Sequence, residues 1–64
     1  MMFISKEVKN YLSIYKDIIN EYRLLVNLGL PYESGIFRVM KDCIVFFYNG
    51  VYNLSWDEYD NIIQ

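Results

Sequence analysis

Carboxylates, lysines and tyrosines are the groups left in this chain for acid–base chemistry, and the carboxylates are the ones that fall into pairs. Asp17 and Glu21 lie four residues apart, which places them one turn apart on a helix. A second group near the carboxyl end comprises Asp57, Glu58 and Asp60. Paired carboxylates can serve as the acid and base of a glycosidase. The structural alternative puts the first pair on a solvated helix side and the second group in a first helical turn, where the dipole favours acids. We expect the structural alternative.

Other catalytic groups are few, because the chain has no histidine and a single cysteine. This count excludes a zinc site built from His and Cys ligands. Cys43 lies in a strand pattern on the expected core face of a sheet, where a free cysteine behaves as a small apolar residue. The three glycines are isolated from one another, so they form no glycine-rich phosphate loop. We therefore expect no enzymatic activity, no metal and no cofactor.

The charge balance disfavours nucleic acid as a partner. Six Lys and Arg residues stand against eight Asp and Glu residues, for a net charge of -2, whereas nucleic-acid-binding domains present a basic stripe. Four basic residues do share the polar half of a predicted helix, namely Lys6, Lys9, Lys16 and Arg23. A nucleic-acid-associated regulator that presents this half as a dimer is therefore the alternative function.

A long amino-terminal helix over residues 6–28 would position these side chains. Ser5 is its predicted N-cap, and Gly29 followed by Pro31 would end it. Apolar residues recur along it at alternating spacings of four and three, which is typical of a helix with one face on a core. This stripe comprises Ile4, Val8, Tyr11, Tyr15, Ile18, Tyr22 and Leu25, with Leu12, Ile19 and Val26 as a flanking track.

The length of this helix bears on self-association. About 23 helical residues extend roughly 34 Å, whereas a strand of five or six residues spans about 17–20 Å. Part of the stripe must therefore be covered by the carboxyl-terminal segment or by a second chain, and helix pairing uses a seven-residue recurrence. The alternative, in which one wide stripe simply packs on a sheet, stays open.

Three strands are predicted after the helix, at residues 36–40, 43–48 and 51–54, because these runs are rich in branched and aromatic residues. The dipeptide at residues 49–50, Asn-Gly, favours a type I′ hairpin, which would place Tyr48 opposite Val51. The turn at Lys41-Asp42 is less well defined, and a longer loop there could shift the pairing by one residue.

A short second helix is predicted over residues 57–63. It follows the tetrapeptide Ser-Trp-Asp-Glu at residues 55–58, which matches the capping-box pattern. The fold class is therefore α+β, with a long helix, a three-stranded antiparallel meander and a short helix in the order α-β-β-β-α. The whole chain, residues 1–64, forms a single small domain.

With Met40 opposite Cys43 and Tyr48 opposite Val51, both faces of the sheet are apolar, and one long helix can cover only one of them. We expect the first face, which includes Cys43, Val45 and Phe47, to be the covered one. The second face is then expected to form an interface, to which tyrosines of the helix would contribute; the alternative places those tyrosines at the edge of the core. The expected interface residues are Phe37, Val39, Ile44, Phe46, Tyr48 and Val51, with Tyr15 and Tyr22.

Size and composition complete the functional prediction. A domain of roughly 60 residues buries only about 60% of the surface that its unfolded chain exposes, which leaves it marginally stable. One cysteine allows no internal disulfide, so association with another copy or a partner is the remaining means of stabilisation. We expect a non-enzymatic protein-interaction module, self-associating as a dimer, that acts as an inhibitor or adaptor on a larger protein. The chain is rich in Ile, Tyr and Asn and lacks Ala and Thr. This bias is typical of A+T-rich genomes and favours a phage or mobile-element protein directed against host defence. The sequence shows no signal peptide and no membrane-spanning run, which predicts a cytoplasmic location.

Overall fold

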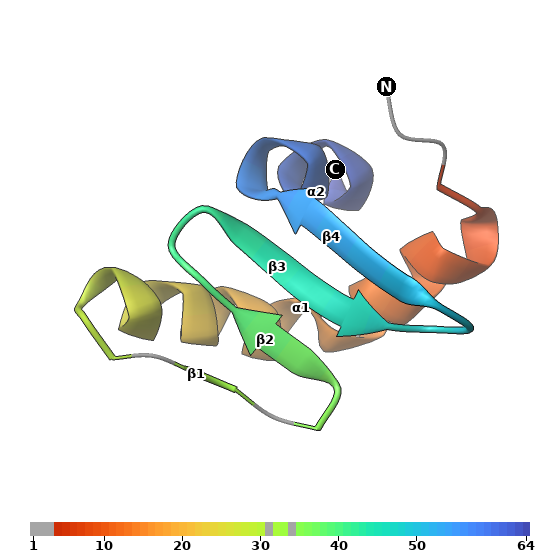
Figure 1. Ribbon diagram of the computed structural model, residues 1–64. Helices are drawn as coiled ribbons and strands as arrows, with labels where there is room; N and C mark the ends of the chain where they lie inside the picture. Colours follow the sequence, from red (N-terminus) through yellow and green to blue (C-terminus); the bar gives the residue numbers. More distant parts are fainter. Residues whose placement is uncertain (1–3, 31, 34) are drawn as a thin grey trace.

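The computed structural model describes residues 4–30, 32–33 and 35–64, and its strands form one antiparallel sheet in the order β1-β2-β3-β4 (Figure 1). The predicted α-β-β-β-α fold is confirmed, and a two-residue strand, β1, is added at the sheet edge. The elements are α1 (Lys6–Asn27), β1 (Tyr32–Glu33), β2 (Phe37–Val39), β3 (Cys43–Phe47), β4 (Val51–Ser55) and α2 (Trp56–Ile63).

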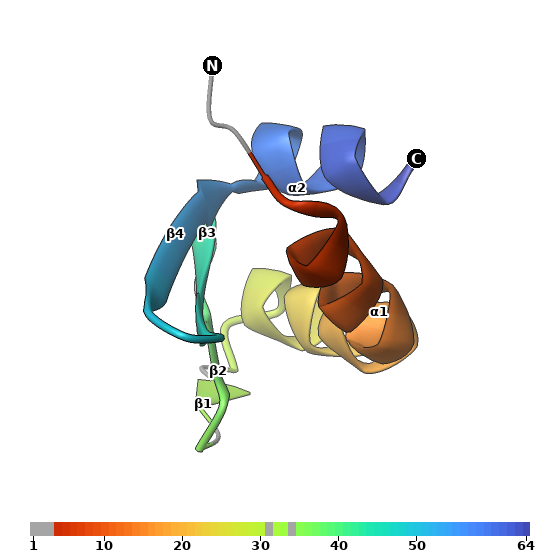
Figure 2. The same cartoon turned by 90° about the vertical axis from the view of Figure 1, so that its right-hand side faces the viewer.

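Both helices lie on the same side of the sheet. Figure 2 shows the sheet edge-on, with α1 and α2 on one side and no described segment on the other. The helix α1 contacts β1, β2 and α2, whereas α2 contacts β3 and β4. The molecule therefore has two layers, and one face of the sheet is left open. Within the described residues, neither helix has the length and apolar content needed to cross a membrane.

The ends of α1 follow the predicted capping signals. The Ser5 hydroxyl accepts a hydrogen bond from the Val8 backbone N–H at 3.3 Å. Gly29 has a φ of 89°, and the next residue, Leu30, donates its N–H to the Leu25 carbonyl at 3.0 Å. This is the Schellman arrangement, in which a left-handed residue closes the helix. The helix ends one residue earlier than predicted, and the second predicted stop signal, Pro31, lies outside the described residues.

The predicted capping box of α2 is also present. The Ser55 hydroxyl accepts the Glu58 N–H at 3.2 Å, and the Glu58 side chain accepts the Ser55 N–H at 2.9 Å. These reciprocal bonds satisfy two backbone donors that the first turn would otherwise leave unpaired. A helix of eight residues begins directly at the end of β4 for this reason.

The buried side of α1 shows which positions of its apolar stripe lie in the core. Val8, Leu12, Ile19 and Val26 are at most 6% exposed, so the buried positions run along most of the helix. The track that we expected to flank the stripe is in fact its centre. Because α1 runs obliquely behind the sheet (Figure 1) and also contacts α2, the chain's own elements cover these four positions, whereas Ile18 of the same stripe remains 38% exposed.

The pairing of β2 with β3 agrees with the prediction, but that of β3 with β4 differs by one residue. Asn49 and Gly50 have the expected positive φ angles, 51° and 140°. However, Phe47 rather than Tyr48 lies opposite Val51. Three residues, 48–50, therefore separate the two strands, and the predicted two-residue turn is wrong.

This one-residue shift changes which face each side chain of β4 occupies. It brings Tyr52 and Leu54 onto the face of Ile44 and Phe46, and it leaves Asn53 on the opposite face. One face then carries only large apolar and aromatic side chains, each worth roughly 1.5–3 kcal/mol when buried. Such a gain exceeds the preference of a dipeptide for a two-residue turn, so the hydrophobic pattern decides the register.

Candidate protein-interaction surface

Four residues that we expected at an interface belong to the core. Phe37, Val39, Ile44 and Phe46 are at most 2% exposed and form one cluster with the buried side of α1. The covered face of the sheet is therefore the one that we predicted to be open, and these four side chains are removed from the interface. The physical reason is the shift of β4, which completes an apolar surface on their side and moves polar side chains to the other.

The tyrosines of α1 lie at the edge of this core. Tyr11 and Tyr15 pack edge to face, with ring centroids 5.2 Å apart, and Tyr15 reaches Phe37 at 5.4 Å. Tyr48 packs against Tyr11 with ring centroids 4.9 Å apart. Tyr22 is likewise half-buried against the core cluster. Their rings thus pack against the rim of the core. Of the two interpretations made from the sequence, the structure shows the position at the edge of the core.

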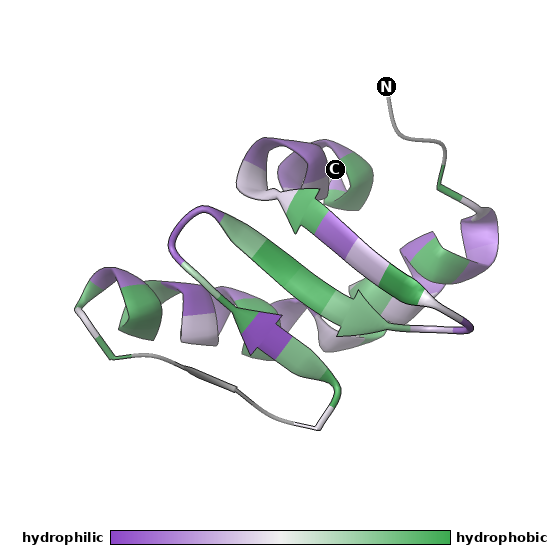
Figure 3. Cartoon of the chain, viewed as in Figure 1, coloured by the Kyte–Doolittle hydropathy of each residue, from purple (hydrophilic) through white to green (hydrophobic). Residues whose placement is uncertain are grey.

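The opposite face of the sheet is the open one and forms the candidate interaction surface. Phe47 is 50% exposed and Val51 is 68% exposed, although both are large apolar side chains in paired strands. Figure 3 views the sheet from this side and shows apolar β3 in its middle, between mixed strands. We name as the open face the outward side chains of β2, β3 and β4, which are Arg38, Cys43, Val45, Phe47, Val51, Asn53 and Ser55.

Two flanking residues extend this surface. Ile36 and Met40, at either end of β2, are 41% and 37% exposed. Cys43, expected in the core, is instead half-buried on the open face. The sequence held a signal for this face, because Arg38 and Asn53 share a side only when β4 is shifted by one residue. Polar residues gathered on one side would have identified that side as the exposed one.

A second cluster of contacts joins the two helices. The Trp56 Nε1–H donates to the Met40 carbonyl at 2.8 Å. The Arg23 guanidinium lies 4.4 Å from the centre of the Trp56 ring and binds both carboxylate oxygens of Asp60, at 2.8 Å and 3.3 Å. Cation–π and bidentate carboxylate contacts both favour arginine over lysine here. Arg23 is therefore part of the seam between α1 and α2 and not of a free basic face.

These contacts also assign roles to the candidate acid–base groups. Glu58 caps α2, and Asp60 holds Arg23. Asp17 and Glu21 lie on the exposed outer side of α1, and Asp57 is exposed at the start of α2. The structure does not bring the two carboxylate groups together around a shared cavity. Their arrangement fits the structural interpretation made from the sequence.

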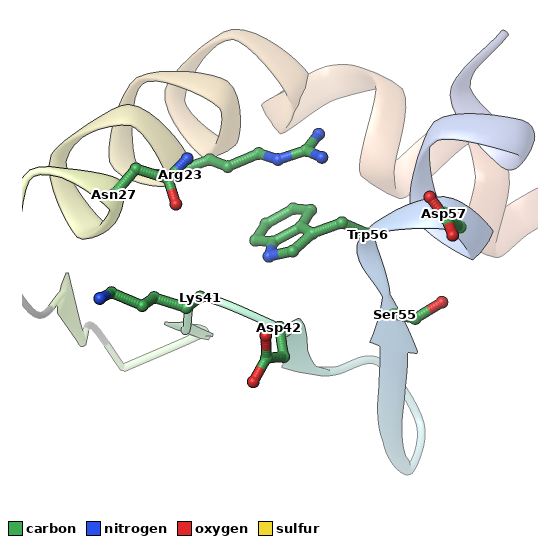
Figure 4. A pocket seen from close by; sticks show the side chains of 7 residues that line it. All are labelled: Arg23, Asn27, Lys41, Asp42, Ser55, Trp56 and Asp57. Atoms are coloured by element: carbon green, nitrogen blue, oxygen red, sulfur yellow. The ribbon is translucent and has the colours of Figure 1, made fainter.

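A hollow of about 290 Å³ lies beside this seam, between the end of α1, the turn after β2 and the start of α2 (Figure 4). Arg23 and the Trp56 ring lie side by side along it, so both groups are already engaged with each other. The exposed charges at its rim are of both signs, which favours no single class of ligand. Its lining residues are Arg23, Asn27, Lys41, Asp42, Ser55, Trp56 and Asp57.

The Tyr59 hydroxyl is buried in the same region and has no hydrogen-bond partner among the described residues. Burial raises its pKa to about 12, with a smaller contribution from the nearby Asp60 carboxylate. Since the unfolded phenol ionises near pH 10, this group destabilises the fold as the pH rises from about 10 to about 12. The loss reaches about 2–3 kcal/mol at the upper end.

Replacing Tyr59 by Phe removes the unpaired hydroxyl and keeps the ring. We expect the Tyr59→Phe variant to be as stable as the parent at pH 7 or more stable by up to about 1 kcal/mol, because an unsatisfied buried donor is lost. Its stability should also fall less between pH 10 and pH 12. Urea unfolding at pH 7, 10 and 12 measures both effects. A variant less stable at pH 7 by more than about 1 kcal/mol would contradict the unpaired state of this hydroxyl.

Neither metal-ligating side chains among the described residues nor similarity to a known protein indicates another site. Within residues 4–30, 32–33 and 35–64, no group of three or more His, Cys, Asp or Glu side chains is placed to hold a metal ion. Comparison of the chain with models of protein families, with curated proteins and with solved structures gave no match.

Proposed function

We propose that this protein is a non-enzymatic protein-interaction module that self-associates through the open face of its sheet. The observation that carries the proposal is the exposure of two large apolar side chains at the hairpin end of that face, Phe47 and Val51. An antiparallel sheet can face water on one side when that side is polar. Here the outward residues of β3 are Cys43, Val45 and Phe47. None of them has the charged or amide side chain that a strand facing water usually carries.

Covering this face is favourable for a chain of this size. Large apolar side chains contribute roughly 1.5–3 kcal/mol each when they move from full exposure to burial, so half-exposed ones contribute part of that. A domain of 64 residues has little stability to spare. Association through an apolar face would therefore add stability that the small core cannot supply alone.

The finer form of the proposal concerns what the assembled protein does. An inhibitor or adaptor that occupies the surface of a larger protein needs a stable fold and a contact surface but no catalytic group. The composition bias toward Ile, Tyr and Asn adds the hypothesis of a phage or mobile-element protein directed against host defence.

The proposal is tested by the solution mass of the parent chain and of two aspartate variants. Sedimentation equilibrium should show a parent mass above that of the monomer, within a range of about 1 μM to 1 mM. The Phe47→Asp variant should stay monomeric over the same range. Ile14→Asp is the matched control, because Ile14 is 75% exposed on α1, on the other side of the sheet.

Two outcomes would reject the proposal. One is a parent chain that remains monomeric over the whole concentration range. The other is equal association of the parent and the Phe47→Asp variant, which would place the contact elsewhere. Dissociation of the Ile14→Asp variant alone would move it to the outer side of α1.

A further inference from the structure

The outer edge of β4 is open to a further strand. β4 is the last strand of the sheet, and within the described residues α1 makes no contact with it. Figure 2 shows the start of α1 in the helix layer, behind the sheet and not in its plane. Edge strands usually carry lysine or proline, which prevent pairing with another chain. The sequence of β4, Val-Tyr-Asn-Leu-Ser, contains no charged residue and no proline.

The register of the sheet shows which backbone groups of β4 point toward this edge. Successive residues of an antiparallel strand direct their N–H and C=O groups alternately to its two sides. The Tyr48 N–H donates to the Gly50 carbonyl at 3.0 Å, so residue 50 directs its carbonyl toward β3. With the observed register, the even-numbered residues of β4 bond to β3 in the same way. The odd-numbered residues therefore direct their backbone groups outward.

One of the three outward-directed residues is already engaged. The Ser55 N–H donates to the Glu58 carboxylate at 2.9 Å, and the Ser55 carbonyl belongs to the first turn of α2. The other two residues are Val51 and Asn53, and both are exposed. Their backbone groups have no hydrogen-bond partner within the part of the chain that the structure describes. The capping box thus closes one end of the edge and leaves two donors and two acceptors.

Resting on the self-association proposed above, we infer that the β4 edges of two copies pair antiparallel about a two-fold axis at Tyr52. This register places Val51 opposite the partner's Asn53 and Asn53 opposite the partner's Val51. Each of these pairs exchanges two backbone hydrogen bonds across the junction. Every outward group that the capping box leaves unpaired on either copy is then satisfied.

The competing register has its two-fold axis at Asn53. It pairs Asn53 with the partner's Asn53 through two hydrogen bonds and places Val51 opposite the partner's Ser55. Because Ser55 is engaged by Glu58 and α2, the groups of Val51 would stay unpaired. The axis at Tyr52 forms twice as many bonds. It also brings the two Tyr52 side chains together in a non-hydrogen-bonded pair, where aromatic rings stabilise a sheet.

Edge pairing also enlarges the open face. Two copies of four strands each form one eight-stranded sheet, and the axis perpendicular to it keeps both open faces on the same side. Two such sheets can then pack face to face as a closed tetramer. Four exposed backbone bonds hold two free copies only weakly, because association itself is costly. Copies joined at their open faces present two edges at once, so we expect edge pairing between such dimers.

Replacing Asn53 by Pro tests this contact. Proline removes the outward N–H of residue 53 and is tolerated in an edge strand whose N–H faces solvent. In sedimentation equilibrium, the parent mass should exceed that of a dimer near about 1 mM, whereas Asn53→Pro should stop at the dimer. Asn53→Ala is the matched control, because it removes the same side chain but keeps the N–H. It should assemble like the parent.

Amide hydrogen exchange of the parent chain measures the same contact without a substitution. The Val51 and Asn53 N–H groups should exchange at least about tenfold more slowly near 1 mM than at concentrations where the chain is monomeric. The Ser55 N–H, which Glu58 binds, is the internal control, and its exchange should change less. In the Asn53→Pro variant, the Val51 N–H should exchange rapidly at both concentrations.

The register is tested by nuclear Overhauser effects in a mixture of isotope-labelled and unlabelled chains. Residues of a non-hydrogen-bonded pair bring their Hα atoms close together. The axis at Tyr52 predicts a contact between Tyr52 Hα and the partner's Tyr52 Hα. The competing axis predicts a contact between Tyr52 and the partner's Leu54, and observing it would overturn the inferred register.

The outcomes separate this inference from the proposed function. Assembly beyond the dimer that Asn53→Pro abolishes and Asn53→Ala retains, together with slowed exchange at Val51 and Asn53, supports edge pairing. A parent chain that stops at the dimer, an Asn53→Pro variant that assembles like the parent, or an Asn53→Ala variant that stops at the dimer overturns edge pairing. Each of these leaves the open-face contact standing. A parent chain that stays monomeric overturns both.

Discussion

Replacing Phe46 by Asp is expected to unfold the protein. Phe46 is fully buried, stacks on Tyr52 with ring centroids 5.1 Å apart and lies 6.0 Å from the Tyr11 ring. Removing a buried aromatic side chain destabilises a protein by about 3–5 kcal/mol, and an unpaired buried carboxylate adds to that. Small domains have about 5 kcal/mol of stability at most. Far-UV circular dichroism should therefore show loss of helix at 25 °C.

The neighbouring residue provides the control for this prediction. Phe47 is the next residue of β3, has the same side chain and points to the opposite face, where it is half-exposed. The Phe47→Asp variant should keep the helical spectrum of the parent and lose at most about 1 kcal/mol of stability to urea. If both variants unfold, or if both fold, the assignment of the two faces of β3 is contradicted.

Replacing Trp56 by Ala is expected to have the second largest effect, a loss of about 3–5 kcal/mol. The Trp56 ring contacts Tyr59 edge to face at 5.4 Å, supports the Arg23 guanidinium and donates to the Met40 carbonyl. It thereby joins α2, α1 and the turn after β2. Urea unfolding followed by circular dichroism is the suitable measurement, because the variant has no tryptophan fluorescence.

The Trp56→Phe variant separates packing from hydrogen bonding. It keeps an aromatic ring under Arg23 but has no N–H for the Met40 carbonyl. An unpaired acceptor of this kind lowers stability by about 1–3 kcal/mol. We therefore expect a stability between that of the parent and that of Trp56→Ala. Equal losses in the two variants would mean that the hydrogen bond, and not the ring, holds α2 in place.

The helices of this protein, and the position but not the length of the turn between β3 and β4, could be predicted from sequence because their causes are local. Ser5 and Gly29 mark the ends of α1 through bonds to residues at most five positions away. The capping box of Ser55 and Glu58 starts α2 in the same way. Positive φ angles at Asn49 and Gly50 likewise follow from the residue types themselves.

The face that is buried and the face that stays open depended on the tertiary structure. Moving β4 by one residue relative to β3 alters hardly any local preference but transfers Tyr52, Asn53 and Leu54 to opposite faces. Likewise, no local signal pairs Arg23 with Asp60, because 37 positions separate them in the chain. Local chemistry therefore specified where helices and turns lie. The register of β4 and the packing of both helices on one face of the sheet decided which apolar side chains form the core and which remain exposed.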